Sequence, residues 1–372
     1  MKKVLFVATV VKAHIMVFHI PVIKWFKENG YETYVCARND YENKEECVVP
    51  YCDNYYDVPF ERSPFKLNNI KVYKLLKEII DSNKFDLIHC HTPMGGVLTR
   101  LAASNARRNN TTVIYTAHGL HFYKGAPLPN WLLYYPVERW LARYTDVLIT
   151  INKEDYNRVK KFKAKRIEYV PGVGIDSKKF RKVDNEKIAK RKEIGVPEES
   201  YVILSVGELN KNKNHEVIIR ALATLKNKNI QYVICGHGIL ENHLKELADA
   251  LGIEEQLKLL GFRNDIGEIC KASDLFAFPS YREGLSVSLM EAMASGLPVI
   301  CSGIRGNSDL IENGKGGYLI KPDDIDGFAN ALRKLSANQL DKESFGEFNK
   351  NAIEEFNIEN VMLIMSKIYL DV

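Results

Sequence analysis

Short runs of apolar residues alternate with longer segments of helical periodicity along the first half of the chain. The pattern predicts buried strands at residues 3–8, 31–37, 85–90, 112–116 and 146–150. It predicts helices at residues 18–28, 71–81 and 96–107, the second with Val72, Leu75, Leu76 and Ile79 at helical spacing. Strands that alternate with helices in this way favour a parallel, doubly wound sheet.

The same alternation begins again after a break rich in glycine and proline. Pro171, Gly172 and Gly174 interrupt the pattern, and the highly charged segment 177–192 has few apolar positions, so we expect an interdomain linker there. Residues 201–207 then begin a second set of strands and helices. The sequence therefore predicts an α/β protein with two tandem Rossmann-like domains and a cleft between the carboxyl edges of their sheets. The expected domains are residues 1–175 and 176–355, followed by a C-terminal helix at 356–372 that can pack back on the first domain.

The most informative stretch is residues 275–300, which predicts a strand, a polar loop, a short helix and another strand. Ser286 or Ser288 can cap the helix. A polar loop that leads into a helix N-terminus just beyond a strand is where open α/β sheets bind anions. Two carboxylates, Glu283 and Glu291, bracket that helix start, which suits a phosphate that carries hydroxyl-rich groups.

Length and composition narrow the class of protein. The 372 residues are enough for two domains with separate cores, and the hydrophobic fraction of 46% is ordinary for a globular chain. No apolar run approaches the roughly 18 residues of a membrane-spanning helix, and the run at 4–11 is too short for a signal peptide. Seven cysteines without paired spacing predict reduced thiols in a cytosolic protein.

Charge is unevenly distributed between the two halves. Residues 1–180 carry 28 Lys and Arg against 18 Asp and Glu, whereas the remainder is acidic overall. A basic half can meet nucleic acid, an anionic membrane or an acidic substrate, but no nucleic-acid-binding signature is present. The basic run 159–166 and the aromatic run 131–136 together suit a membrane interface. A solvated helix face with ordinary packing aromatics is the alternative.

Three further segments follow predicted strands of the second half and can line one pocket with the 279–300 stretch. The loop from Gly207 to Lys213 can meet phosphate through its backbone and its lysine. Gly236 lies in a Gly-His-Gly turn, and Phe262 and Arg263 follow the next strand, where backbone groups often meet a nucleobase. The chain has neither a P-loop nor a Gly-x-Gly-x-x-Gly turn, which argues against a P-loop ATPase and a nicotinamide enzyme.

Together these residues resemble glycosyltransferase family 4, whose members are retaining enzymes of GT-B fold. The specific part is the Glu-x7-Glu pattern of Glu283 and Glu291, set within Pro-Ser-x-x-Glu-Gly…Glu-Ala-Met-Ala-x-Gly-x-Pro-Val. The resemblance extends over nearly the whole chain through the loop 207–213, the break 170–176, Thr-Ala-His-Gly at 116–119 and Gly-Tyr-Leu-Ile at 317–320.

The resemblance implies a role for each matching position around the nucleotide sugar. Lys213 would neutralise the diphosphate, and Glu283 would bind hydroxyls of the donor sugar. Gly284 and Leu285 would offer backbone N–H groups, and Glu291 would bind the ribose hydroxyls. From the residues alone, Glu291 could instead complete a capping box with a serine three positions earlier, and Lys213 could be a solvated loop lysine.

Two positions depart from the family pattern. Glu208 stands where the family has an arginine beside the lysine, and we expect Arg305 to supply the second cation, ahead of Arg263 and Arg282. After the first strand, residues 9–14 read Thr-Val-Val-Lys-Ala-His in place of a glycine-rich loop. Lysine, a second cation and a helix N-terminus can stabilise a departing phosphate without a metal.

The histidines of the first domain allow more than one reading. The resemblance places His118 at the cleft face near the transferring sugar, although it could also be a buried, satisfied histidine. His89 and His91 would share one face of a strand, but no third ligand is near them in the sequence. We therefore expect no metal site and no cofactor beyond the nucleotide sugar.

The resemblance implies a retaining transferase that moves a hexose or N-acetylhexosamine from a UDP-sugar to a saccharide acceptor. A polyprenyl-pyrophosphate-linked acceptor would bring the basic first domain to the cytoplasmic face of the membrane. The branch that carries Thr-Ala-His-Gly-Leu-His-Phe-Tyr-Lys-Gly, here residues 116–125, implies capsule, exopolysaccharide or other surface glycan synthesis. Two alternatives stay open: a non-transferring enzyme such as a UDP-N-acetylglucosamine 2-epimerase, and a non-catalytic nucleotide-sugar-binding protein, which Glu208 would favour.

Overall fold

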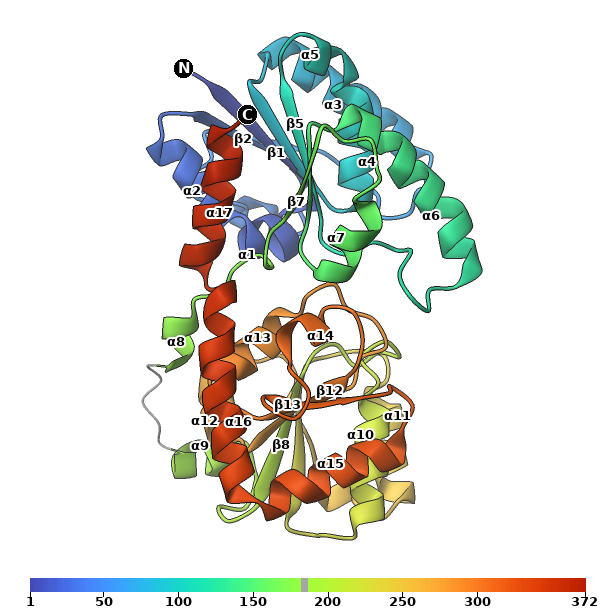
Figure 1. Cartoon of the computed structure of the whole chain (residues 1–372), viewed down its shortest axis with the longest axis vertical. Coiled ribbons are helices and arrows are strands. Elements are labelled where there is room, and N and C mark those ends of the chain that lie inside the picture. Colours follow the sequence, from blue (N-terminus) through green and yellow to red (C-terminus); the bar gives the residue numbers. More distant parts are fainter. Residues whose placement is uncertain (182–186) are drawn as a thin grey trace. The chain divides into compact units, whose positions relative to one another are not determined.

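The computed structural model describes residues 1–181 and 187–372, and these divide into two compact units (Figure 1). Unit 1 comprises Met1–Gly174 together with Val361–Val372, and unit 2 comprises Ile175–Asn360. The observed boundary therefore lies one residue before the expected one. The chain returns to unit 1 at Val361, whereas the expected C-terminal helix began at residue 356.

Unit 1 is built on a seven-stranded sheet with the order β3-β2-β1-β4-β5-β6-β7, in which all paired strands are parallel. Its strands are β1 (Lys3–Val10), β2 (Glu32–Arg38), β3 (Asn54–Asp57), β4 (Leu87–His91), β5 (Thr112–Ala117), β6 (Val147–Thr150) and β7 (Arg166–Tyr169). The chain runs outward from β1 to β3 and then enters β4 on the other side of β1. Such a reversal of strand order opens a crevice at the carboxyl edge of the sheet.

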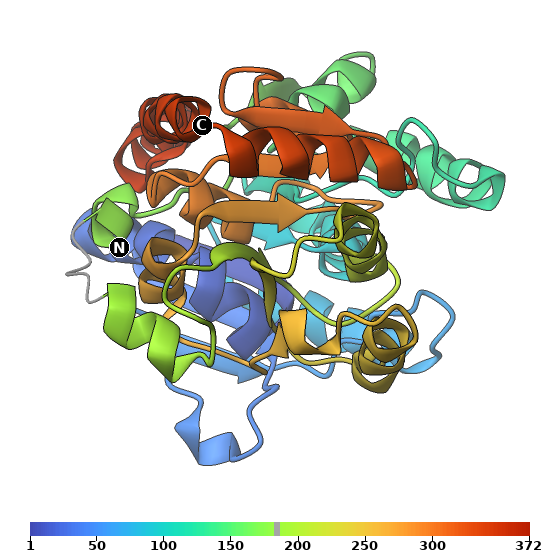
Figure 2. The same ribbon diagram turned by 90° about the horizontal axis from the view of Figure 1, so that it is seen from below.

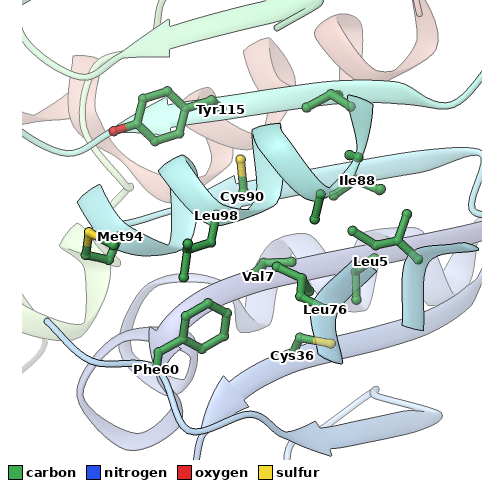
Figure 3. Close-up of a cluster of buried hydrophobic side chains, with 14 of the residues drawn as sticks. Leu5, Val7, Cys36, Phe60, Leu76, Ile88, Cys90, Met94, Leu98 and Tyr115 are labelled. Carbon is green, nitrogen blue, oxygen red and sulfur yellow. The ribbon is translucent and has the colours of Figure 1, made fainter. Parts of the chain in front are cut away.

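Helices cover both faces of the unit-1 sheet. On one face, Leu5 and Val7 of β1 join a core that α3 (Asn68–Asn83) and α4 (Pro93–Ala102) complete, and Figure 3 shows Leu76 and Leu98 packed there. On the other face, Phe6 joins a core with α2 (Ile20–Glu28) and α17 (Ile358–Leu370). Because both faces are covered, the residues of the central strands are nearly all buried and most of them are apolar. The remaining helices of this unit are η1 (Val11–Ile15), α1 (Met16–Phe18), η2 (Lys44–Glu46), α5 (Ser104–Arg108), α6 (Leu128–Leu141), η3 (Ala142–Tyr144) and α7 (Lys153–Val159).

The sequence reading missed both edge strands of unit 1. The strand β3 reads Asn-Tyr-Tyr-Asp and β7 reads Arg-Ile-Glu-Tyr, and every residue of the two is at least partly exposed. An edge strand pairs on one side only, so it does not need the continuous apolar run that marked the central strands.

Unit 2 repeats the design with a six-stranded parallel sheet in the order β10-β9-β8-β11-β12-β13. Its strands are β8 (Tyr201–Val206), β9 (Ile230–Cys235), β10 (Leu257–Leu259), β11 (Leu275–Phe278), β12 (Val299–Ser302) and β13 (Gly317–Ile320). The strand order reverses between β8 and β11. Figure 2 shows α15 (Ile325–Ala337, orange-red) running across this sheet, where it contacts β12 and β13. The other helices are α8 (Ser177–Arg181), α9 (Lys187–Glu193), α10 (His215–Leu225), α11 (Glu241–Ala250), η4 (Glu254–Gln256), α12 (Ile266–Ala272), α13 (Val287–Ala294), α14 (Asn307–Leu310), α16 (Gln339–Ala352) and η5 (Ile353–Phe356).

The prediction of a linker at 177–192 was wrong for the described part of that segment. Helices α8 and α9 belong to unit 2, where Phe180 is buried in its core. The Arg191 guanidinium is 4% exposed and lies 2.6 Å from the carboxylate of Asp274. Residues 182–186 lie outside the described residues. The segment was misread because its many charges and few apolar positions suggested a linker, whereas one of those charges, Arg191, is paired inside the fold.

The predicted fold class is confirmed: the chain forms two doubly wound α/β units with parallel sheets. In the described residues we find no helix with both the length and the apolar character that crossing a bilayer requires.

Candidate active site

Two loops of unit 2 meet at the carboxyl edge of the sheet, where the strand order reverses. The first follows β8 and carries Lys213, and the second follows β11 and carries Glu283. The Asn212 side-chain amide donates to the carbonyl of Arg282 (3.0 Å), and the Tyr281 N–H donates to the carbonyl of Asn212 (2.8 Å). These cross-links fix the two loops against each other.

Lys213 and Glu283 form an ion pair in this edge. The Lys213 Nζ lies 2.8 Å from Oε1 of Glu283, and the two side chains are only 19% and 14% exposed. The lysine stem passes close to Gly207, where a Cβ would stand 3.0 Å from Lys213 Cε. The Lys213 Nζ also lies 4.6 Å from the centroid of the Phe278 ring. The structure thus brings together the lysine and the carboxylate that the sequence singled out.

Three arginines were candidates for the second cation, and of these Arg305 contacts the loop of this pair. Its side chain is 8% exposed, and its Nε donates to the carbonyl oxygen of Glu283 at 3.0 Å. Arg263 instead holds the carboxylate of Asp265 (2.5 Å), while Arg282 is exposed. The geometry therefore favours Arg305 over the other two arginines as the second cation.

Backbone groups of the Glu283 loop lead into helix α13. Gly306 has φ +81° and packs so tightly that a Cβ would stand 2.2 Å from the Gly284 carbonyl oxygen. Within the described residues, neither the Gly284 nor the Leu285 N–H is bonded to another part of the chain. Ser286 caps the helix by accepting from the Leu289 N–H at 3.4 Å. The positive end of the helix dipole and these N–H groups can bind an anion.

Glu291 lies one turn further along α13. Because Ser286 is the cap, Glu291 is the fifth residue of the helix and is too far along it to complete a capping box. Burial raises the pKa of the Glu291 carboxyl to about 7, an effect that Lys179 partly opposes. Within the described residues, no donor lies within hydrogen-bonding distance of this carboxylate. The Glu291 carboxylate is therefore a partly buried acceptor that can receive hydrogen bonds from ligand hydroxyls.

The remaining predicted residues of unit 2 lie at the ends of the neighbouring strands. Gly236 follows β9 and packs on the loop after β8, since a Cβ there would stand 2.0 Å from the Gly207 carbonyl oxygen. Phe262 follows β10, is 70% exposed, and donates its N–H to Nε2 of His237 at 3.1 Å. Both lie at the same edge of the sheet as Lys213.

Unit 1 carries a group of four histidines at its own carboxyl edge. His118 follows β5, and its Nε2 lies 3.3 Å from Nδ1 of His91, the last residue of β4. Burial lowers the pKa of His118 to about 4. His14 and His19, which follow β1, complete the group. The sequence reading missed these two because only the fold brings the segment after the first strand beside His91 and His118.

His89 is a separate, satisfied histidine on the same face as His91. The two rings lie 4.1 Å apart, as expected for alternate residues of one strand. The His89 Nε2 contacts Oγ1 of Thr116 at 2.8 Å, and its Nδ1 contacts the hydroxyl of Tyr369 at 2.9 Å. Both of its ring nitrogens are therefore occupied.

A large cavity opens beside this edge within unit 1. Its volume is about 850 Å³, and residues of α3, α4 and α6 line it together with His14 of η1 and the loop residue Arg62. Its inner wall is apolar and includes Met94, Leu98 and Phe122. Five apolar residues of its wall are exposed to solvent: Phe65, Leu67, Ile70, Leu133 and Val137. No motif in the sequence pointed to this cavity, because its residues are dispersed over about 130 positions.

Comparison with known proteins settles the family. Residues 22–178 match the family model described as Glycosyltransferase Family 4, and residues 186–354 match the model described as Glycosyl transferases group 1. EpsD of Bacillus subtilis (strain 168), itself named a glycosyltransferase only provisionally, is 43% identical over 339 residues, which cover 90% of this chain and 87% of EpsD. The chain belongs to glycosyltransferase family 4. Its predicted membership and its predicted class as a transferase are thereby confirmed, and the alternatives of an epimerase and a non-catalytic binding protein are set aside.

A further relative and two solved structures extend the comparison. The Escherichia coli UDP-Gal:alpha-D-GlcNAc-diphosphoundecaprenol alpha-1,3-galactosyltransferase is 33% identical over 310 residues, which cover 81% of this chain and 78% of that enzyme. Among solved structures, Anabaena Alr3699/HepE in complex with UDP and glucose superposes with a TM-score of 0.83 at 20% identity over the whole of both chains. Sucrose-phosphate synthase from Thermosynechococcus elongatus gives 0.81 at 18% identity over 100% of this chain and 99% of that one. These likenesses confirm the GT-B fold of this family 4 protein.

Proposed function

We propose that this glycosyltransferase moves a sugar from a UDP-sugar to a lipid-linked saccharide, with retention of anomeric configuration, in the assembly of a bacterial surface polysaccharide. One observation carries the donor half of the proposal: Lys213, Glu283 and Arg305 converge at the strand reversal of unit 2, beside the start of α13. The names of the relatives support the choice of substrates, because the E. coli enzyme takes a UDP-sugar and a diphosphoundecaprenol-linked saccharide.

The donor site separates a place for phosphate from a place for sugar. Lys213, the Arg305 guanidinium and the amides at the start of α13 offer positive charge to a diphosphate, and such preorganised charge stabilises a leaving group. Glu283 offers its carboxylate to hydroxyls of the donor sugar. Glu291 offers an acceptor to the ribose hydroxyls. None of these roles requires a metal ion at the donor.

The reaction that follows exchanges one bond at the anomeric carbon for another. The bond from that carbon to the phosphate oxygen breaks, and its electron pair leaves with the diphosphate. The acceptor hydroxyl oxygen forms the new bond on the same face, and the leaving phosphate takes its proton. Lys213 and Arg305 act on the charge that builds on the phosphate as the bond breaks.

The acceptor half of the proposal rests on the cavity of unit 1. A polyprenyl chain needs an apolar groove, and the cavity offers about 850 Å³ with an apolar inner wall. Phe65, Leu67 and Ile70 are 78%, 80% and 57% exposed, so an apolar surface continues from the cavity into solvent. Arg62 and Lys66 in its lining suit a pyrophosphate or an anionic headgroup. Exposed apolar residues beside basic ones are typical of a protein that rests on a membrane surface.

A transfer assay with the full-length protein tests the proposal. The protein is incubated in mixed micelles with UDP-sugars and polyprenyl-pyrophosphate saccharides, products are identified by mass spectrometry, and the anomeric configuration is read by NMR. We expect one donor and acceptor pair to give an α-linked product from an α-linked donor, and Glu283→Ala to abolish it. Turnover of a UDP-sugar that needs no acceptor, or full transfer by Glu283→Ala, would contradict the proposal.

A further inference from the structure

Beside its apolar residues, the lining of the unit-1 cavity holds one group of polar and aromatic side chains. Tyr134 and Glu138 are four residues apart on α6, so they lie on one face of that helix. The ring centroids of Tyr134 and His121 are 4.5 Å apart, and the Glu138 carboxylate lies 3.5 Å from the hydroxyl of Tyr115. All four residues line the cavity. The donor chemistry of unit 2 uses none of them.

Glu138 is held in place by a buried arginine. Arg100 of α4 is 0% exposed, and its Nη2 lies 2.9 Å from Oε2 of Glu138. The Arg100 Nε donates to the Gly96 carbonyl at 2.9 Å, and the guanidinium lies 3.9 Å from the centroid of the Tyr115 ring. A Cβ on Gly96 would stand 2.4 Å from Cε2 of Tyr115, so a glycine there makes room for the ring. These contacts fix the position of the Glu138 carboxylate.

The second oxygen of Glu138, Oε1, retains the capacity to accept hydrogen bonds. Its contact within the described residues is the Tyr115 hydroxyl at 3.5 Å, which is too long for a strong hydrogen bond. A carboxylate can accept about four hydrogen bonds. Glu138 is also the only Asp or Glu that the described residues contribute to the lining of this cavity. A hydrogen-bond donor on a ligand in the cavity can therefore bind to Oε1.

Asp146 shows the contrasting case of a buried carboxylate of unit 1 with a purely structural role. It accepts from Nε of Arg107 and from the N–H of Val113, both at 2.9 Å, and lies 2.6 Å from Nζ of Lys165. It does not line the cavity. Glu138 has one strong partner and faces a space of about 850 Å³.

The charges around Glu138 favour a neutral hydrogen-bond donor over an anion. Arg100 balances the charge of Glu138, and the carboxylate would repel a pyrophosphate placed beside it. Arg62 and Lys66 of the same lining suit that anion instead. The neutral donors of a saccharide are its hydroxyls and any acetamido N–H. In a largely apolar pocket, a few such polar contacts fix the orientation of the ligand.

We propose that Glu138 accepts a hydrogen bond from a hydroxyl or acetamido N–H of the acceptor saccharide, with the rings of Tyr134 and His121 against that sugar, and so determines which acceptor is used. This inference rests on the proposed function, in which unit 1 binds the acceptor, and it adds where the sugar lies in the cavity. The rings offer apolar surface to the face of the sugar. No motif in the sequence pointed to Glu138, because its partner Arg100 lies on another helix.

Binding of a soluble amphiphile tests the proposal without any transfer. The probe is n-octyl N-acetyl-α-D-glucosaminide, since the name of the E. coli relative places an α-D-GlcNAc on the diphosphate. It is titrated into the full-length protein by calorimetry, below its critical micelle concentration. We expect Glu138→Gln to raise the Kd by about 10–10²-fold, as loss of a hydrogen bond to a charged group does, and Tyr134→Leu to raise it by about tenfold.

Two matched variants of unit 1 are the controls. Asp146→Asn alters a buried carboxylate that is paired with an arginine, and Tyr144→Leu removes a half-buried tyrosine from η3. Neither residue lines the cavity, so both variants should bind the probe as the wild type does. Circular dichroism checks that each variant is folded. Replacing both charges by apolar residues, as in Arg100→Met with Glu138→Leu, avoids an unpaired buried charge and serves where Glu138→Gln does not fold.

Analogues of the probe identify the group that Glu138 binds. Each analogue lacks one donor: the set comprises the monodeoxy sugars and the plain glucoside, which has no acetamido N–H. In the wild type, one analogue should bind about tenfold more weakly than the parent. In Glu138→Gln the same analogue should bind as the parent does, because the hydrogen bond is already missing.

The outcomes separate this inference from the proposed function. A wild type that does not bind the probe, or a folded Glu138→Gln that binds the probe and every analogue as the wild type does, overturns the inference. If transfer to a lipid-linked acceptor succeeds and Glu138→Gln leaves it unchanged, the inference alone fails. If the probe binds through Glu138 but no pair of donor and acceptor reacts, the proposed function alone fails.

Discussion

In unit 2 the carboxyl edge of the sheet holds charged groups that contact one another, whereas in unit 1 the corresponding edge holds four neutral imidazoles. Lys213 and Glu283 are paired at 2.8 Å, and Arg305 bonds the backbone of the same loop. His91 and His118 meet at 3.3 Å, and burial keeps both uncharged near pH 7. The two sheets share one strand order apart from the seventh strand of unit 1, so the difference arises from the side chains at and just beyond the strand ends.

The two edges also differ in what builds them. At the edge of unit 2, the backbones of the loops pack against each other, with glycines where they approach most closely. At the edge of unit 1, side-chain rings pack on one another. A charged, rigid edge is suited to holding a diphosphate, because preorganised charge needs no rearrangement as the bond breaks. A neutral edge beside an apolar cavity is suited to a ligand that brings an apolar chain. The comparison therefore supports a donor role for unit 2 and an acceptor role for unit 1.

Removing the cation of unit 2 should give the largest effect. Lys213→Ala takes one positive charge from the leaving-group site, and we expect kcat/KM for transfer to fall by about 10²–10³. Lys211→Ala removes an exposed lysine from the same loop and should change the rate little. Steady-state kinetics of both variants with one donor measure this difference. Equal rates for the two variants would mean that the charged edge of unit 2 has no special role.

A charge placed in the apolar cavity of unit 1 should affect the acceptor alone. Ile70 lines the cavity, whereas Leu75 lies on the same helix α3, outside the lining. Ile70→Glu should lower kcat/KM for a lipid-linked acceptor by about 10–10², the equivalent of losing the burial of one large apolar side chain. The KM for the nucleotide sugar should stay constant.

Two controls separate lipid binding from general damage by Ile70→Glu. Leu75→Glu introduces the same charge elsewhere on α3 and should leave acceptor kinetics unchanged. An acceptor that carries a short water-soluble group in place of the lipid should be used equally by wild type and Ile70→Glu. A defect that persists with the short acceptor would show that the cavity does not bind the lipid.

Gly306→Ala tests whether close backbone packing builds the edge of unit 2. Gly306 and Gly314 have nearly the same φ, +81° and +82°, but a Cβ on Gly306 would stand 2.2 Å from the Gly284 carbonyl, and one on Gly314 would meet nothing within 4 Å. Both substitutions strain the backbone, so their difference isolates the contact. We expect Gly306→Ala to lower the free energy of unfolding by about 1–3 kcal/mol more than Gly314→Ala, as overpacking does. Urea titration of both variants measures the difference, and equal losses would contradict the packing argument.

The sequence predicted the fold and the centre of the donor site because local patterns encode both. Apolar runs marked the buried strands, and the stretch around Glu283 already contained a strand, a polar loop and a helix start. Lys213 could be paired with Glu283 because both follow strands that a doubly wound sheet places side by side. The expectation of Arg305 ahead of Arg263 had no local pattern behind it, since the choice depends on which groups each guanidinium meets in space.

What the sequence could not provide was proximity between distant segments. His14 and His118 lie 104 positions apart, and nothing local to either shows that their rings meet. The cavity of unit 1 has the same origin, because its wall is shared among α3, α4, α6 and several loops. The charged segment containing Arg191 was misread for a related reason, as its partner Asp274 lies 83 positions away.

The smallest effect we expect is a dependence of nucleotide binding on pH through Glu291. Burial raises the pKa of this carboxyl to about 7 in the folded protein, from 4.5. Since the folded pKa is the higher one, the folded state binds more protons between these values. Through Glu291, the stability of the folded protein therefore falls as the pH rises from about 4.5 to about 7. Above that range the loss stays constant.

Binding of ribose should respond in the opposite direction. An ionised carboxylate accepts hydrogen bonds at both oxygens, which suits two ribose hydroxyls, whereas the protonated form gives up part of that capacity. We expect the Kd of UDP to decrease as the pH is raised from 6 to 8 and to level off above about 7, with a change of at most about tenfold per pH unit below the pKa. Because the terminal phosphate of UDP also titrates near pH 6, the informative quantity is the difference between wild type and Glu291→Gln, measured by calorimetry at each pH. If the two proteins show the same pH dependence, Glu291 does not bind the ribose in its ionised form. Glu283 would then be the last residue along the loop and α13 whose charge acts in donor binding.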